Sequence, residues 1–231
     1  MNPDGVLFDA AGTLFDLMPP IPDVIASTAE RHGLSCSPPR VELALNHIGG
    51  TLGWPDDAPD PRSRTRAWAT FVHSILKETG LEAPSITRQR IAEAAAITIL
   101  EPANYRVFPD VIPMIERLTA ARVPIGIVSN FDDLLFDILD HTGLAKLFPT
   151  VLTSYRTGSV KPDSRIFHLA TRAIGAEPEA TYYIGDSIYS DMGGALKAGL
   201  HGVLIDRDGR HPTYSGEKIT SLMNLHMSIG S

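Results

Sequence analysis

The order of strand-like and helix-like segments is the feature that most constrains the fold of this chain. One short apolar run, at residues 5–8, is followed by a long segment, 17–106, that contains no convincing strand. Apolar runs rich in β-branched residues then return at 124–129, 181–185 and 202–206, with helical patterns between them. Strands joined through helices need crossover connections, which predicts a largely parallel sheet in an α/β domain.

The segment 17–106 is predicted to be an all-helical insertion after the first strand. Proline-rich joints divide it into stretches with helical patterns, and we predict a loop from Gly49 to Arg64. We expect an α/β core formed by 1–16 and 107–231, with 17–106 as a helical cap domain. The other predicted segments are a weaker strand at 150–154 and helices at 21–33, 39–47, 63–80, 87–101, 109–121, 132–142, 163–174 and 188–199.

Composition and charge exclude several classes of function. The 231 residues carry a formal net charge of −7, which argues against non-specific nucleic-acid binding, because that needs a basic surface. No apolar run reaches the roughly 18 residues of a membrane span, and the N-terminus lacks the pattern of a secretory signal. A single cysteine, Cys36, allows no internal disulfide and fits a reducing compartment. We expect a cytoplasmic protein that binds neither nucleic acid nor membrane.

Polar side chains follow the predicted strands at their carboxyl ends, where parallel sheets bind ligands. Taken alone, each has an ordinary explanation, since aspartate, serine and asparagine cap helices and lysine is usually solvated. Together they converge on one edge of the sheet, which predicts a ligand site there. These residues are Asp9, Ser129, Asn130, Lys161, Asp186 and Asp191.

Four motifs occur in order along the chain: FDAAGTL at 8–14, IVSN at 127–130, KPD at 161–163 and GDSIYSD at 185–191. With GVLIDRDGRHP at 202–212, they resemble the haloacid dehalogenase-like (HAD) hydrolase superfamily, in the subfamily with a helical C1 cap. The resemblance implies a Rossmann-like parallel-sheet core with an inserted helical cap, and phosphatase-type chemistry. The stretch DAAGTLF is similar to the group named after a rhythmically expressed insect gene, whose members also lack the second aspartate of the first motif.

The resemblance implies a role for each motif residue. Asp9 would be the nucleophile that forms an aspartyl-phosphate, while Ser129 and Lys161 would act in catalysis by binding the transferring phosphoryl oxygens. The substrate would be a small phosphorylated or otherwise anionic metabolite, and the protein a monomer or homodimer. The implied Mg²⁺ ligands are Asp9, the backbone carbonyl of Ala11 and Asp186, with Asp191 acting through water or Lys161. The other implied substrate contacts are Gly12, Thr13 and Asn130.

Ala11 stands where the family pattern has an aspartate that protonates the leaving group and then activates water. Such acid–base help is worth about 10²- to 10⁴-fold in rate, or roughly 3 to 5 kcal/mol of barrier. The enzyme could use leaving groups that need little protonation, such as acyl or aryl phosphates, or a proton donor from the cap or the substrate. Alternatively, it hydrolyses a carbon–halogen or carbon–phosphorus bond, or binds a phosphorylated ligand without turnover.

The remaining residues favour a phosphatase. Relatives that break carbon–halogen bonds work without metal and typically lack the first aspartate of the fourth motif, whereas this chain has Asp186. Relatives that break carbon–phosphorus bonds have alanine at the position of Ala11 and use a cap lysine as a Schiff base. Here Lys77 is the only lysine between residues 16 and 106, and it is expected to be a solvated helix charge. We predict a Mg²⁺-dependent phosphatase-like hydrolase first, and a weak or inactive ligand-binding protein second.

Aromatic and basic residues of the insertion have two interpretations each. Trp68 lies at helical spacing from other apolar residues and is expected in the core of the cap, while Trp54 is a candidate for substrate contact. Arg62, Arg64 and Arg66 could meet a substrate anion, but we expect them on a solvated face.

Overall fold

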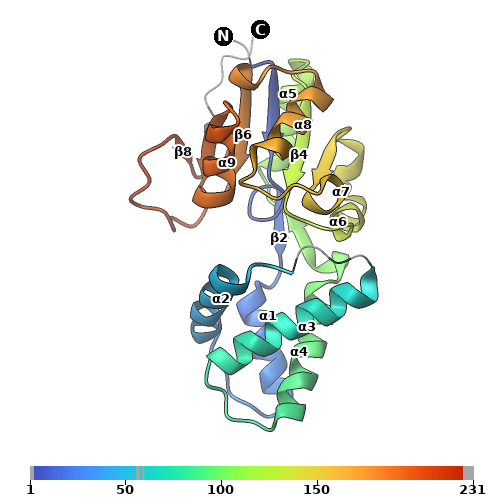
Figure 1. Cartoon of the computed structure of the whole chain (residues 1–231), viewed down its shortest axis with the longest axis vertical. Coiled ribbons are helices and arrows are strands. Elements are labelled where there is room, and N and C mark those ends of the chain that lie inside the picture. Colours follow the sequence, from blue (N-terminus) through green and yellow to red (C-terminus); the bar gives the residue numbers. More distant parts are fainter. Residues whose placement is uncertain (1–2, 56–57, 59, 226–231) are drawn as a thin grey trace. The chain divides into compact units, whose positions relative to one another are not determined.

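The computed structural model of the chain describes residues 3–55, 58 and 60–225. The chain divides into two compact units (Figure 1). The first contains Met1–Asp16 and Arg106–Ser231, and the second contains Leu17–Tyr105. The sequence predicts that the chain re-enters the first unit at residue 107, one residue after the observed boundary at Arg106. Among the described residues, no helix combines the length and the apolar character needed to cross a membrane.

A six-stranded sheet forms the centre of the first unit, in the order β5-β4-β1-β6-β7-β8. Every pairing within it is parallel, which confirms the predicted sheet and the α/β class. The chain passes from β1 to β4 on one side and returns to β6 on the other, and ligands of parallel sheets bind at such a reversal. The strands are β1 (Gly5–Phe8), β4 (Ile125–Ser129), β5 (Val151–Thr153), β6 (Thr181–Gly185), β7 (His201–Ile205) and β8 (Lys218–Ile219).

Helices of the first unit lie alongside this sheet (Figure 1). Alternate residues of neighbouring strands, among them Leu7, Val128 and Tyr183, form a buried cluster with Phe167 and Ala170 of α8. This alternation follows from the two-residue period of a strand. The helices are α5 (Val111–Ala120), α6 (Leu134–Thr142), α7 (Ser154–Thr157), α8 (Ser164–Ile174) and α9 (Gly193–Lys197), with short helical turns at Leu144–Lys146, Pro178–Ala180 and Leu222–Asn224.

The predicted helix at 188–199 is divided in two. A π-helical turn, Ile188–Met192, precedes α9. The Ser187 side chain accepts a hydrogen bond from the Ser190 N–H and caps this turn. The wider turn places Asp191 where its carboxylate accepts a hydrogen bond from the Ser187 N–H, at 2.9 Å.

The second unit is helical, and the predicted loop from Gly49 to Arg64 is wrong in its extent. The helix α2 continues through Gly49 and ends at Leu52, and α3 begins at Pro61 after its cap residue Asp60. Glycines are tolerated within a helix at a modest cost, which is why they did not end α2. The helices are α1 (Ile21–Arg31), α2 (Pro38–Leu52), α3 (Pro61–Glu78) and α4 (Ser85–Ile99), with a short turn at Pro102–Asn104.

A separate two-stranded sheet joins the segments through which the chain leaves and re-enters the first unit. It pairs β2 (Phe15–Leu17) with β3 (Tyr105–Val107). The Met18 N–H donates to the Asn104 carbonyl oxygen at 2.8 Å, and the Phe108 N–H donates to the Leu14 carbonyl oxygen at 3.1 Å. Both strands are too short to give a period in the sequence, and they were not predicted.

Candidate active site

The chain turns sharply after β1, and this turn carries the predicted nucleophile. The Ala10 carbonyl oxygen accepts hydrogen bonds from the N–H groups of Thr13, Leu14 and Phe15, at 3.3, 2.8 and 3.4 Å. Residues 9–15, called the nucleophile loop below, are therefore wound around one carbonyl oxygen. Asp9 at its start is only 7% exposed.

Gly12 brings the nucleophile loop against Asp186. Its φ is +76°, which glycine adopts without strain. A Cβ atom at this position would lie 2.5 Å from Asp186 Oδ2. The contact between the first and fourth motifs therefore depends on the absence of a side chain at Gly12. Its predicted contact with substrate stays a prediction.

Lys161 is the centre of the hydrogen-bond network. Its ammonium group lies 2.6 Å from Asp9 Oδ1, 2.6 Å from Asp191 Oδ1 and 2.9 Å from the Tyr183 hydroxyl oxygen. These three acceptors match the three hydrogens of the ammonium group. Burial opposes the charge on Lys161, but the carboxylates of Asp191 and Asp9 outweigh it and hold the pKa of Lys161 above its usual value.

Asp9 is held from two sides through the same oxygen atom. The Ser129 hydroxyl donates to Asp9 Oδ1 at 2.8 Å, beside the bond from Lys161. Among the described residues, no side chain is hydrogen-bonded to Asp9 Oδ2. One carboxylate oxygen is therefore fixed, and the other is left for a further partner.

Asn130 organises the backbone of Lys161. Its amide nitrogen donates to the Lys161 carbonyl oxygen at 3.0 Å, and its amide oxygen accepts from the Lys161 N–H at 2.8 Å. The second motif thus holds the third by a reciprocal pair of bonds. We infer a positioning role for Asn130, whereas its predicted contact with substrate stays a prediction.

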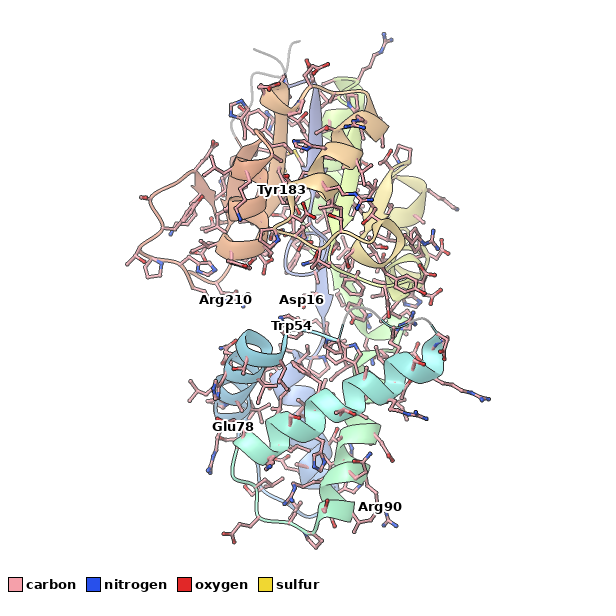
Figure 2. The ribbon with its side chains drawn as sticks, in the orientation of Figure 1. Asp16, Trp54, Glu78, Arg90, Tyr183 and Arg210 are labelled. Atoms are coloured by element: carbon pink, nitrogen blue, oxygen red, sulfur yellow. The ribbon has the colours of Figure 1, made fainter. Side chains whose placement is uncertain are left out.

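Tyr183 belongs to the site, although its position in an apolar run predicts only a strand residue. It is fully buried in β6, and its position in the first unit is labelled in Figure 2. Its hydroxyl accepts from Lys161 and lies 2.9 Å from the Val128 carbonyl oxygen and 3.1 Å from Asp191 Oδ1. Burial, reinforced by the charges of Asp191 and Asp9, raises the pKa of Tyr183 well above its usual value. The hydroxyl is therefore a neutral bridge.

Three carboxylates meet beside this network. Asp9, Asp186 and Asp191 each offer an oxygen atom, and these atoms lie within 4.8 Å of one another. Burial, with the neighbouring charges of Asp9 and Asp191, raises the pKa of Asp186 to about 8. Burial also raises the pKa of Asp191, although the ammonium of Lys161 opposes this shift. Such clustered carboxylates need positive charge, and oxygen ligands of this kind fit Mg²⁺.

Thr13 and Ala11 lie in the nucleophile loop but differ in exposure. The Thr13 side chain is fully buried, and its hydroxyl has no hydrogen-bond partner in the described part of the chain. Ala11 is half-buried. The structure brings both residues into the site, and their predicted contacts with substrate and metal stay predictions.

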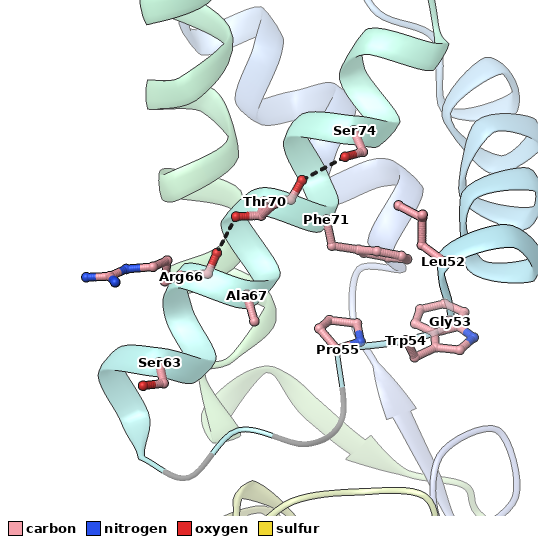
Figure 3. Close-up of a pocket in the computed structure, with 10 residues that line it drawn as sticks. All are labelled: Leu52, Gly53, Trp54, Pro55, Ser63, Arg66, Ala67, Thr70, Phe71 and Ser74. Carbon is pink, nitrogen blue, oxygen red and sulfur yellow. Dashed lines mark hydrogen bonds between the residues drawn. The ribbon is translucent and has the colours of Figure 1, made fainter.

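The second unit carries an aromatic hollow of about 440 Å³. Figure 3 shows Leu52, Trp54, Pro55 and Phe71 gathered on one side of it, with the Trp54 and Phe71 ring centroids 5.5 Å apart. Figure 3 also shows Arg66 pointing away from these rings. A planar or apolar group is therefore the ligand chemistry that this hollow suits.

The arginines of α3 do not share one environment. Arg62 and Arg66 are exposed, as expected for a solvated face, but Arg64 is only 7% exposed. The expectation was wrong for Arg64, because its position on α3 lies on the packed side of the helix. Trp68, expected in the cap core, is half-buried and contacts Trp54 and Phe71.

Comparison with known proteins identifies the family. Residues 3–199 match the model of the haloacid dehalogenase-like hydrolases. The chain belongs to this family. The family resemblance found in the sequence is thereby confirmed, whereas the finer group of relatives that lack the second aspartate stays a prediction.

Several members of the family are similar to most of this chain. Haloacid dehalogenase-like hydrolase domain-containing protein 3 from Bos taurus is 29% identical, over 86% of this chain and 80% of that protein. A phosphoserine phosphatase from Thermus thermophilus is 32% identical, over 71% of this chain and 66% of that protein. The crystal structure of a HAD phosphatase from Thermococcus onnurineus is 27% identical with a TM-score of 0.61, over 95% of this chain and 94% of that one.

The site of this HAD hydrolase thus brings together the residues predicted from its motifs. Asp9, Ser129, Lys161 and Asp191 are joined by direct hydrogen bonds, and Asp186 lies against Gly12. Tyr183 was not predicted as a site residue. The signal for it was a hydroxyl-bearing residue in an apolar strand, where a buried tyrosine usually has a hydrogen-bond partner.

Proposed function

We propose that this HAD hydrolase is a Mg²⁺-dependent phosphatase that acts on a small phosphorylated metabolite through an aspartyl-phosphate at Asp9. The observation that carries the proposal is the placement of Asp9. One of its oxygens is fixed by Ser129 and Lys161, and two further carboxylates lie within 4.8 Å. A fixed carboxylate next to a metal-type oxygen cluster is suited to covalent phosphoryl transfer.

The reaction proceeds in two displacements. An oxygen of Asp9 attacks phosphorus, and the bond from phosphorus to the leaving oxygen breaks with its electron pair on that oxygen. Water then attacks the phosphorus of the acyl-phosphate, which releases inorganic phosphate and restores the Asp9 carboxylate. The ammonium of Lys161 and the hydroxyl of Ser129 lie beside Asp9, where they can donate hydrogen bonds to the transferring phosphoryl oxygens.

The residues present fit a Mg²⁺ ion. Asp9 and Asp186 supply carboxylate oxygens, and the carbonyl of Ala11 is available whatever side chain stands there. Bound Mg²⁺ would offset the charge between the carboxylates and an incoming phosphoryl group. Asp191 has one oxygen bonded to Lys161 and the other to the Ser187 N–H, which supports an indirect role through Lys161.

Ala11 limits the leaving group. Without a carboxylic acid at this position, we infer that acyl and aryl phosphates react fastest, because their leaving groups need little protonation. The retained Asp186 argues against metal-free dehalogenation. Lys77, the candidate Schiff base for carbon–phosphorus cleavage, is exposed on α3. An inactive ligand-binding protein is the second candidate, because Ala11 removes the usual acid.

The proposal is tested with initial rates of phosphate release from acetyl phosphate and from an unactivated alkyl monoester. We expect Mg²⁺-dependent release from acetyl phosphate that stops when the metal is chelated, and much slower release from the monoester. Comparable rates on both would mean that another group replaces the missing acid. Release from neither, at any Mg²⁺ concentration, would favour the ligand-binding alternative.

Mg²⁺ binding is expected to depend on pH through Asp186. The pKa of Asp186 is raised from 3.8 to about 8. Between these two pH values, its carboxyl group holds a proton in the folded protein that it has lost in the unfolded chain. This carboxyl therefore destabilises the metal-free protein increasingly as the pH rises towards about 8. Because Mg²⁺ displaces the proton, its apparent affinity should rise by about tenfold per pH unit below about pH 8.

Thermal unfolding with and without Mg²⁺, from about pH 6 to about pH 8, measures this effect. The stabilisation by Mg²⁺ should grow with pH in the wild type. It should be small at every pH in Asp186→Asn, which keeps the shape of the side chain without its charge. Equal stabilisation at all pH values in the wild type would contradict the raised pKa of Asp186, and full stabilisation of Asp186→Asn by Mg²⁺ would contradict its assignment as a ligand.

A further inference from the structure

Arg207 is half-buried and contacts the nucleophile loop directly. None of the four motifs assigns it a role. It follows β7, and its Nη2 atom donates to the Thr13 carbonyl oxygen at 2.7 Å. The guanidinium carbon also lies 3.9 Å from the centre of the Phe108 ring. Phe108 in turn donates its N–H to the Leu14 carbonyl oxygen, at 3.1 Å. The carbonyl groups of Thr13 and Leu14 are thus held by Arg207 and by Phe108, which stack on each other.

Asp110 fixes the guanidinium group. Arg207 Nη1 donates to Asp110 Oδ2 at 2.9 Å, and Arg207 Nη2 donates to Asp110 Oδ1 at 3.1 Å. The Ser221 hydroxyl and the Leu222 N–H also donate to Asp110 Oδ2, at 2.7 and 2.8 Å. The side chains of Arg207 and Asp110 are 14% and 9% exposed. Burial opposes ionisation of Asp110, but the bonds from Arg207 and Ser221 hold its pKa below the usual range.

We propose that Arg207 is a positioning residue, which holds the nucleophile loop through the Thr13 carbonyl oxygen so that Asp9 keeps its direction of attack. Asp110 keeps the guanidinium in place, and the stack on Phe108 sets its plane. The planar guanidinium can bond the Asp110 carboxylate with two parallel bonds while reaching a third acceptor. A lysine ammonium has neither this shape nor the stacking face, so it cannot make all of these contacts at once.

The catalytic consequence rests on the proposed phosphatase function, but the loop contact itself does not. A misplacement of about 1 Å of a reacting group can lower a rate by about 10²-fold. Loss of the Arg207 contact should therefore lower kcat much more than it changes KM. Independently of any activity, it should speed hydrogen exchange at the N–H groups of Thr13, Leu14 and Phe15, which all bond the Ala10 carbonyl oxygen.

The experiment uses Arg207→Ala with free guanidinium ion as a chemical replacement for the lost group. The matched control is Arg156→Ala, because Arg156 also pairs with an aspartate and stacks on a phenylalanine. Its Nε lies 2.7 Å from Asp133 Oδ1 and its guanidinium lies 3.8 Å from the centre of the Phe136 ring. That pair is exposed and bonds no residue of the nucleophile loop in the described part of the chain.

In Arg207→Ala we expect kcat on acetyl phosphate to fall by about 10²-fold and to recover at least in part with guanidinium at low, non-denaturing concentration. Exchange at the three loop amides should speed up and slow again with guanidinium, and Arg156→Ala should show neither change. If Arg207→Ala does not fold, Arg207→Lys should show faster loop exchange and a lower kcat than the wild type.

Folded variants with unchanged loop exchange would overturn the proposal, whatever the wild-type activity. Faster loop exchange with unchanged kcat would overturn the positioning role in an active enzyme. If the wild type releases no phosphate, the phosphatase function fails, while the exchange experiment still decides whether Arg207 holds the loop.

Discussion

Asp9→Asn should abolish phosphate release, with a loss of at least about 10³-fold on acetyl phosphate. An amide oxygen is a poor nucleophile for phosphorus, and the variant also removes a charged ligand from the metal cluster. Asp191 is poorly placed to replace it, because one of its oxygens is bonded to Lys161 and the other to the Ser187 N–H. Initial rates at saturating Mg²⁺ measure the loss, with Mg²⁺-dependent thermal shifts recorded in parallel.

Asp9→Asn should still fold, so a loss of activity in this variant would not be caused by unfolding. Asparagine has nearly the shape of aspartate and can still accept from Ser129, while Lys161 keeps its partners Asp191 and Tyr183. Asp133→Asn is the matched control, because the side chain of Asp133 is half-exposed, pairs with Arg156 and is not one of the three clustered carboxylates. Wild-type rates in Asp9→Asn would show that phosphorus is attacked by some other group, and the proposed mechanism would be wrong.

Ala11→Asp should raise the rate on an unactivated alkyl monoester by about 10²- to 10⁴-fold, the usual value of general acid–base catalysis. The same change should alter the rate on acetyl phosphate much less, because its leaving group needs little protonation. Ala11 is half-buried in the nucleophile loop, so position 11 is not enclosed in the core of the first unit. The ratio of the two rates in each variant measures the effect.

Ala11→Asn is the control that separates proton transfer from shape. It adds an equally large polar side chain but cannot give up a proton, so its monoester rate should stay near that of the wild type. An equal gain in Ala11→Asn and Ala11→Asp would mean that packing, rather than acid catalysis, limits the wild type. No gain in either would mean that another group already protonates the leaving oxygen.

The core fold could be predicted because its central strands are buried on both faces. Short apolar runs such as 5–8 and 181–185 stand out in the sequence, and their polar ends converge once the sheet is parallel. The residues at those ends are the ones that the structure joins through Lys161. The four motifs and their order therefore predicted most residues of the candidate site.

Other parts left no periodic signal. The pairing of β2 with β3 rests on backbone hydrogen bonds over short segments, which side-chain patterns cannot reveal. Tyr183 bonds residues of other segments, and only the folded chain brings its hydroxyl to Lys161 and to the Val128 carbonyl oxygen. Arg207 and Asp110 lie 97 positions apart in the sequence, so their pairing leaves no local signal either. The sequence does not give the full extent of α2, because glycine lowers helix stability only modestly and does not by itself end a helix.

Covalent catalysis by Asp9 is tested by trapping the phosphorylated enzyme. The wild type is mixed with acetyl phosphate and Mg²⁺ and quenched in acid within a turnover, and the modified residue is located by mass spectrometry after digestion. We expect one phosphoryl group on the peptide that contains Asp9, sensitive to hydroxylamine as an acyl-phosphate should be, and none in Asp9→Asn. Turnover without any trapped adduct, or an adduct on another residue, would contradict covalent catalysis by Asp9.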